Sequence, residues 1–172
     1  MSGMAKLPAL IEGARKSPFK LMLLNLFLGR LIPFNRPHGV RILELGTEHV
    51  KTRAPYKRKN QNHIRGVHAC CIATVAEFSS GLLFLSRLNP AHYRLIMAHL
   101  DINYRYQAKS AIIAETRMDE QQLNDEILKP LTETDKLLFT HTTEVHDDQQ
   151  NHIASARVTW QIKRWETVKT KQ

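Results

Sequence analysis

The feature that most constrains the fold of this 172-residue chain is one long apolar stretch between Val67 and Leu88. The stretch is too long for a strand, and the pair Asn89–Pro90 ends it, so it predicts a single long helix. Small residues recur along it and would let a sheet approach the helix closely. They are Ala69, Ala73, Ala76, Ser79, Ser80 and Gly81. A helix of this kind fits best inside a curved antiparallel sheet that wraps around it.

The segments on both sides of this helix have the pattern of strands. Before it, residues 40–45 and 48–56 alternate in polarity around Gly46, which predicts a hairpin. After it, an acidic segment at residues 119–135 predicts a short helix that stops near Pro130. The rest of this part predicts four strands, at residues 99–106, 110–118, 136–147 and 152–165. In the last strand, alternation places five apolar side chains on one face: Ala154, Ala156, Val158, Trp160 and Ile162. One long helix among segregated strands indicates the α+β class.

The first 34 residues predict a helical extension in front of this body. Basic residues precede the apolar run at residues 21–29, as in a secretory signal, but Asn25 interrupts the run and no cleavage site of small residues follows. The run is also shorter than the roughly 20 residues of a membrane span, so we expect no transmembrane segment. We expect an amphipathic helix that packs on the body and ends before Pro33. Weak contact of this helix with a membrane surface is the alternative.

The chain carries a formal net charge of +9, which favours anionic partners. Five basic residues are concentrated just before the long helix: Lys51, Arg53, Lys57, Arg58 and Lys59. They could contact a phosphorylated ligand, or they could belong to an ordinary solvated loop. We expect no nucleic-acid partner, because basic and aromatic positions do not interleave along a strand face beyond residues 104–106.

The only two cysteines, Cys70 and Cys71, are adjacent and form no spaced disulfide framework. They therefore predict a reduced protein of the cytoplasm. Cys71 lies about one helical turn from His68, so a cysteine nucleophile is conceivable, but adjacent cysteines in an apolar helix are more typical of a core. The histidines show no spacing that predicts a metal site.

Glu77 is an acidic residue inside the apolar stretch, where an unpaired charge is costly. Burial should raise the pKa of its carboxyl group, which suits a general base near neutral pH. The helix start near His68 offers free backbone N–H groups, which suit an oxygen that gains negative charge in a tetrahedral transition state. Asn62 could orient a water molecule or a carbonyl. The plainer alternatives are a solvated or ion-paired Glu77 and a His68 that only caps the helix.

Helix geometry separates these two groups within one chain. His68 and Glu77 are nine positions apart, which places them on opposite sides of the helix and roughly 13 Å apart along its axis. They could act on one small reacting group across a two-fold dimer, where the helix start of one chain approaches the middle of its partner's helix.

The spacing of Asn62, His68 and Glu77 resembles the signature of hotdog-fold acyl-CoA thioesterases. That signature is an Asn, a "HGG"-like turn at the start of the central helix, and an acid within the helix. The turn at Phe34–Asn35 and the pattern "N…VHA…AE" resemble most closely a branch known only as a domain of unknown function. The resemblance implies a hotdog domain at residues 35–172 behind the helical extension at residues 1–34. It also implies a homodimer, or a pair of such dimers, with active sites at the interface.

The resemblance further implies a thioesterase that hydrolyses an acyl-CoA-type thioester without a metal or redox cofactor, CoA being part of the substrate. Glu77 would activate water or attack the carbonyl, and the N–H group of Ala69 would polarise that carbonyl. Asn62 and His68 would position the reacting groups. Basic side chains would meet the phosphates of CoA, at Arg53, Lys57, Arg58, Lys59 and Arg65.

Three positions depart from the family pattern. Ala69 and Cys70 stand where the family has two glycines, and Met97 stands where some members have a hydroxyl residue. A catalytically inactive hotdog module that binds acyl-CoA or fatty acyl groups is therefore the alternative function.

Overall fold

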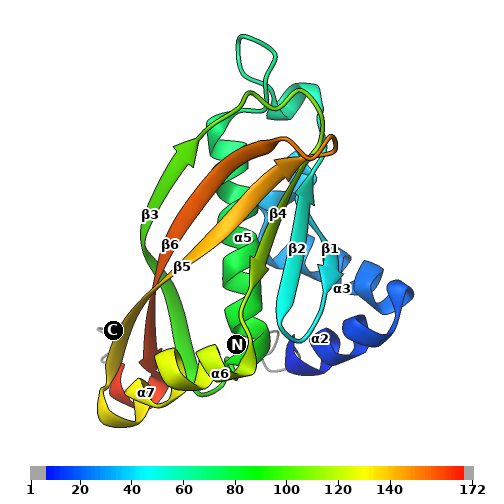
Figure 1. The fold of residues 1–172 in the computed structure, drawn as a ribbon. Coiled ribbons are helices and arrows are strands. Elements are labelled where there is room, and N and C mark those ends of the chain that lie inside the picture. The colour runs from blue at the N-terminus through cyan, green and yellow to red at the C-terminus, as the bar shows by residue number, and fades with distance from the viewer. Residues whose placement is uncertain (1–6, 169–172) are drawn as a thin grey trace.

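The computed structural model describes residues 7–168, which form one curved antiparallel sheet around a long helix (Figure 1). The six strands are ordered β1-β2-β4-β5-β6-β3, so β1 and β3 are the two edges of the sheet. Their bounds are Arg41–Leu45 for β1, His49–Ala54 for β2, Tyr93–Tyr104 for β3, Ile112–Arg117 for β4, Lys136–Asp147 for β5 and His152–Arg164 for β6. Helix α5, Ala69–Arg87, runs through the middle. The α+β class and the wrapped sheet predicted from the sequence are confirmed.

Helix α5 packs on the sheet through its small residues, and polar bonds pin it there. The Ser79 hydroxyl donates to the carbonyl oxygen of Val50 on β2 at 2.9 Å, and Thr52 on β2 donates to the carbonyl oxygen of Val75 at 2.8 Å. On the inward face of β6 the predicted alternation is confirmed, because Ala154, Ala156, Val158, Trp160 and Ile162 are all buried. These contacts hold α5 in one rotation about its axis and thereby decide which helix residues face away from the sheet.

By length and composition α5 could span a membrane, but most of it is buried inside the fold. Its apolar character is therefore that of a core helix.

The N-terminal extension consists of two helices, α2 (Leu7–Lys16) and α3 (Pro18–Leu31), where one was predicted. Pro18 lacks an N–H group and cannot continue α2, while Ser17 is extended and its hydroxyl accepts from the N–H group of Lys20 at 3.4 Å. The two helices pack on each other and on β1, to the right of the sheet in Figure 1. Short helix α4, Asn35–His38, then leads into β1. The boundary at residues 34 and 35 stays a prediction.

Two other boundaries differ from the prediction. Strand β3 begins at Tyr93, six residues early, because this non-alternating segment pairs with the end of β6, where Tyr93 lies opposite Arg164. Pro130 was predicted to stop a helix, but it begins α7, Pro130–Glu133, since a first helical residue needs no N–H partner. Before α7, the acidic segment forms α6, Glu120–Leu123, and a π-helical turn at Asn124–Leu128.

Candidate active site

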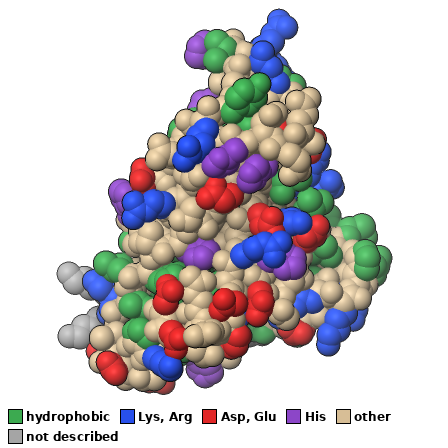
Figure 2. Space-filling view, in the orientation of Figure 1, with side chains coloured by type: hydrophobic (Ala, Val, Ile, Leu, Met, Phe, Trp, Pro, Cys, Tyr) green, Lys and Arg blue, Asp and Glu red, His purple; other side chains and the backbone are tan. Residues whose placement is uncertain are grey.

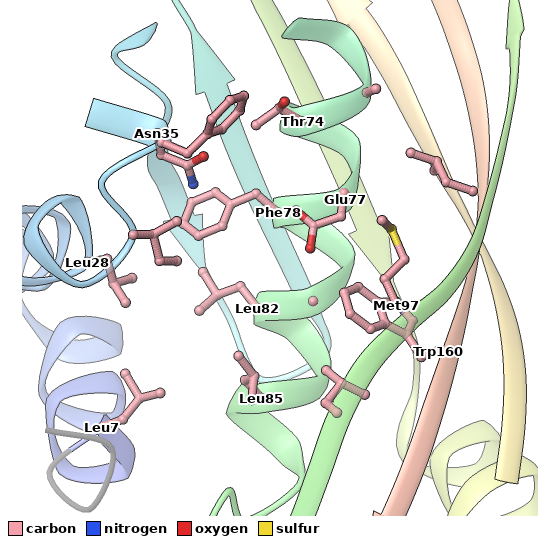
Figure 3. A pocket seen from close by; sticks show the side chains of 16 residues that line it. Leu7, Leu28, Asn35, Thr74, Glu77, Phe78, Leu82, Leu85, Met97 and Trp160 are labelled. Carbon is pink, nitrogen blue, oxygen red and sulfur yellow. The ribbon is translucent and has the colours of Figure 1, made fainter. Parts of the chain in front are cut away.

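A cavity of about 400 Å³ lies beside α5, between the N-terminal helices and strand β3 (Figure 3). The N-terminal helices form one wall, through Leu7 and Leu28, and strand β3 forms the opposite wall, through Leu95, Met97 and Leu100. Most of the lining is aliphatic or aromatic. The cavity is therefore suited to a hydrocarbon group.

Glu77 is the one acidic residue in the lining of this cavity. Figure 3 shows its side chain projecting from α5 between Phe78 and Met97. Burial raises the pKa of the Glu77 carboxyl group above its ordinary value of 4.5. Within residues 7–168 this carboxyl group forms no ion pair and no hydrogen bond. A carboxylate so placed can take a proton from a bound water molecule near neutral pH.

Trp160 forms the floor of the cavity beside Glu77. Its indole N–H group donates to the Ser80 hydroxyl on α5 at 2.8 Å, which fixes the ring against the helix. Gly81 makes this approach possible, because a Cβ atom there would lie 2.9 Å from the ring and 3.7 Å from a carboxylate oxygen of Glu77. The sequence placed Trp160 on the inward face of its strand, but gave no signal that it would reach this site.

Two further polar side chains line the cavity that sequence reasoning did not select. Thr74 lies one turn before Glu77 on the same face of α5, and its hydroxyl donates to the carbonyl oxygen of Cys70 at 2.8 Å. Asn35 is buried and reaches the cavity from α4 (Figure 3). Its side-chain amide forms no hydrogen bond within the described residues. Both side chains can therefore contact a polar group that lies beside Glu77.

The start of α5 carries the other three predicted catalytic residues, away from this cavity. The side chain of His68 caps the helix, where its Nδ1 accepts from the N–H group of Cys70 at 3.1 Å. Asn62 accepts from the N–H groups of Ile64 and Gly66 at 3.1 and 2.9 Å, so it shapes the turn in front of the helix. The N–H group of Ala69 has no acceptor among residues 7–168 and stays free for a ligand.

The cavity lining includes Glu77 but none of Asn62, His68 and Ala69. Ala69 and Glu77 are eight residues apart on one straight helix, or about 12 Å along its axis. The structure thus does not join the predicted acid and the predicted N–H donor within one chain.

Asn60, which the sequence did not single out, anchors the loop before α5. It is buried, and its side-chain amide donates to the carbonyl oxygens of His38 and Pro55, each at 2.8 Å. The backbone carbonyl oxygen of Asn60 accepts from the N–H group of His68 at 2.8 Å. Asn60 and Asn62 are the same residue type in the same polar loop, so the sequence does not show that Asn60 anchors the loop and Asn62 shapes the turn. Only the contacts in the folded chain distinguish these two roles.

The predicted basic residues are spread over the loop and the neighbouring strand. Arg53 on β2 lies 3.4 Å from Asp148 and lines a separate groove. Arg58 and Lys59 lie in a 3₁₀ turn, Arg58–Asn60, and Arg65 has a left-handed backbone conformation in the exposed loop. The amino group of Lys57 lies beside Gly39. None of these side chains lines the cavity at Glu77.

The cysteines behave as core and surface residues. Cys71 is buried, and burial raises the pKa of its thiol to about 11. Such a thiol holds almost no thiolate at neutral pH, which argues against the cysteine nucleophile considered above.

A Ser–His–Glu cluster lies on β5 and β6, outside the cavity. Nε2 of His152 lies 2.7 Å from a carboxylate oxygen of Glu144, and Ser155 lies 2.7 Å from the same oxygen and 3.1 Å from the same nitrogen. A catalytic triad needs the acid and the serine on different ring nitrogens. This cluster therefore lacks the arrangement that activates a serine.

Comparison with known proteins places the chain among thioesterase-like folds. The model of a family described as "Domain of unknown function (DUF4442)" matches residues 22–162. A protein of unknown function from Pseudomonas aeruginosa, described as a probable thioesterase, is 25% identical with a TM-score of 0.76, over 83% of this chain and 95% of that chain. A protein of unknown function from Chlorobaculum tepidum is 14% identical with a TM-score of 0.72, over 87% and 98%.

A thioesterase from Haemophilus influenzae is 11% identical with a TM-score of 0.64, over 81% of this chain and 90% of that chain. No curated protein matches the sequence. The predicted hotdog fold, close to a branch of unknown function, is thereby confirmed.

Proposed function

Since this chain belongs to the DUF4442 family and shares its fold with proteins named thioesterases, we propose that it hydrolyses an acyl-CoA-type thioester. The observation that carries the proposal is Glu77, an unpaired carboxyl group with a raised pKa inside an apolar cavity. The cavity would hold the acyl chain, and the carboxylate would act where the chain meets the thioester.

In this reaction Glu77 takes a proton from a water molecule, and the water oxygen bonds to the thioester carbonyl carbon. The carbonyl oxygen gains negative charge and is stabilised by the free N–H group of Ala69 at the helix start. The carbon–sulfur bond then breaks, and the thiolate of CoA takes the proton from Glu77. The products are a carboxylic acid and CoA. Direct attack by the Glu77 carboxylate, through an anhydride that water then cleaves, gives the same products.

The distance between Glu77 and Ala69 requires a second copy of the chain, and strand β3 is where we propose that it binds. β3 is a twelve-residue edge strand beside the cavity, and its Ile96 and Met97 side chains are exposed. An unpaired edge of this length is a site for adding another strand. Two β3 strands paired antiparallel would give a homodimer in which each cavity is completed by the helix start of the other copy.

The remaining predicted residues take supporting roles. Asn62 and His68 shape the turn and cap that present the Ala69 N–H group, so we assign them to positioning. Lys57, Arg58, Lys59 and Arg65 flank that helix start and would meet the phosphates of CoA. Arg53 forms an ion pair with Asp148 at 3.4 Å, and its contact with a phosphate of CoA stays a prediction.

An inactive acyl-binding module is the second candidate, and one observation favours it. Side chains of Ala69 and Cys70 are exposed at the helix start, where a bound carbonyl would need close access to the backbone. Tight binding of acyl-CoA without release of CoA would select this function.

The test is a panel of acyl-CoAs of rising chain length, with release of the CoA thiol as the readout. We expect turnover by the natural chain and a fall of about 10²- to 10⁴-fold in Glu77→Gln. Exposed Glu133 gives the matched control, Glu133→Gln, which should retain activity. Full activity of Glu77→Gln would overturn the mechanism. If hydrolysis were lost in Cys71→Ala but kept in Glu77→Gln, the thiol mechanism would be favoured instead.

A further inference from the structure

The outer face of helix α3 is apolar and uncovered. Leu24 and Leu28 on the inner face are buried, but the outer face exposes Phe19, Met22, Leu23 and Leu26, each between 43% and 64% accessible. These four positions follow the spacing i, i+3, i+4, i+7, which places them in one stripe along the helix. Figure 2 shows hydrophobic side chains gathered at the outer edge of the molecule over this helix. Contiguous apolar surface of this kind marks an interaction site.

The segment of the chain that carries this outer stripe contains no acidic residue. The sequence from residue 13 to residue 43 contains no Asp or Glu, and it contains six Lys or Arg residues: Arg15, Lys16, Lys20, Arg30, Arg36 and Arg41. Arg30 continues the line of the stripe at the end of α3, about 16 Å from Phe19 along the axis. A partner that meets the stripe therefore also meets positive charge.

At that end of the stripe lies a groove of about 480 Å³ whose lining contains four arginines and no acidic residue. Arg30, Arg36, Arg41 and Arg53 come from α3, α4, β1 and β2, so the fold gathers them from four elements. Arg30, Arg36 and Arg41 form no ion pair within residues 7–168. Leu26 belongs to both the stripe and the groove lining, so the two features form one continuous surface.

We propose that this surface binds an anionic lipid bilayer, with the α3 stripe among the acyl chains and the arginine groove against the phosphate headgroups. A helix that lies in the bilayer interface needs an apolar face with basic residues beside it, and α3 with its groove supplies both. A soluble anion would use the groove but leave the stripe in water. A protein partner would bury the apolar stripe but would not in itself neutralise the arginines. An anionic bilayer does both, because it offers an apolar interior to the stripe and phosphate groups to the arginines.

The test is sedimentation of the full chain with vesicles of phosphatidylcholine, with or without phosphatidylserine, and without acyl-CoA. We expect roughly tenfold or tighter binding to the anionic vesicles. Met22→Glu with Leu23→Glu should abolish it, while Ile64→Glu with Leu138→Glu, two equally exposed apolar positions elsewhere, should not. Arg30→Ala with Arg41→Ala should weaken binding by roughly tenfold, against exposed Lys109→Ala with Lys136→Ala as the charge-matched control.

A second measurement avoids disruptive variants. Phe19→Trp places a fluorescent indole on the stripe, and its emission should shift to the blue with anionic vesicles, whereas Leu138→Trp should not shift.

Equal binding to neutral and anionic vesicles, or no binding at all, would overturn the proposal. Normal lipid binding by the stripe variant Met22→Glu with Leu23→Glu would also overturn it. So would a halving of the particle size of this variant in light scattering, because that result would identify the stripe as a contact between subunits. These outcomes are independent of hydrolysis, because no substrate is present.

Discussion

Replacing Glu77 by Gln should increase the stability of the protein while lowering the proposed thioester hydrolysis by about 10²- to 10⁴-fold. Burial raises the pKa of this carboxyl group in the folded state above 4.5, its ordinary value. The folded chain therefore binds more protons than the unfolded chain between pH 4.5 and the raised pKa. In that window the free energy of unfolding falls as the pH rises. The contribution of the group is fully present below pH 4.5 and is lost above the folded-state pKa.

A glutamine at this position cannot ionise, so the Glu77→Gln variant escapes this loss. Each unit by which the pKa is raised corresponds to about 1.4 kcal/mol, so the variant should gain stability at pH 7 in proportion to the shift. For a chain of this length each kcal/mol corresponds to about 2–4 °C in Tm. Removal of the carboxylate leaves no partner unsatisfied, since Glu77 forms no hydrogen bond within residues 7–168.

The assay is urea unfolding of the natural chain and the Glu77→Gln variant across a pH series. The difference between them should grow as the pH rises from 4.5 and then become constant. Glu133→Gln, at an exposed position, should show no such growth. A Glu77→Gln variant that is less stable at pH 7, or a difference independent of pH, would refute the reasoning.

The cavity, the loop anchor and the N–H donor give three further predictions. Leu85 lines the cavity two turns beyond Glu77. Leu85→Trp should therefore lower kcat/KM at least about tenfold for acyl-CoAs with long chains and leave kcat/KM for acetyl-CoA unchanged. An equal fall at every chain length would contradict the assignment of this cavity to the acyl chain. Asn60→Ala should cost about 1–3 kcal/mol in urea unfolding, because it removes a buried side chain and leaves two half-buried carbonyl oxygens without their donor. A loss below about 0.5 kcal/mol would contradict the anchor role. Ala69→Pro deletes one free N–H group at a helix position that tolerates Pro, so kcat should fall about 10²- to 10³-fold with Tm nearly unchanged. An active Ala69→Pro would remove Ala69 from the mechanism.

Local sequence patterns predicted most of the sheet and the central helix. The alternation of apolar residues from Ala154 to Ile162 can be recognised from the sequence of one strand. The structure confirms it, because these residues form the buried face of β6. The start of β3 was missed because residues 93–98 lack alternation, and they form a strand only through pairing with β6. The break at Ser17 was missed because the helix was inferred from the apolar run at residues 21–29, whereas Pro18 and the whole of α2 lie before that run.

The site was predictable to a lesser degree. An acid within an apolar helix identifies Glu77 and the direction of its pKa shift, since both follow from local context. The residues of the cavity wall could not be predicted in this way, because Leu7, Leu28 and Trp160 are far apart in sequence and meet only in the folded chain. The different tasks of Asn60 and Asn62 depend likewise on contacts with distant backbone.

The central claim, that Glu77 of one copy acts with the Ala69 N–H group of the other, is tested most directly by a mixed dimer. Co-expression of a Glu77→Gln chain and an Ala69→Pro chain with different affinity tags allows this heterodimer to be isolated. If the two groups act across the interface, it contains one intact site and one doubly defective site, and it should hydrolyse acyl-CoA at about half the natural rate. If they act within one chain, both sites are defective, and a heterodimer as inactive as the two parent homodimers would contradict the account.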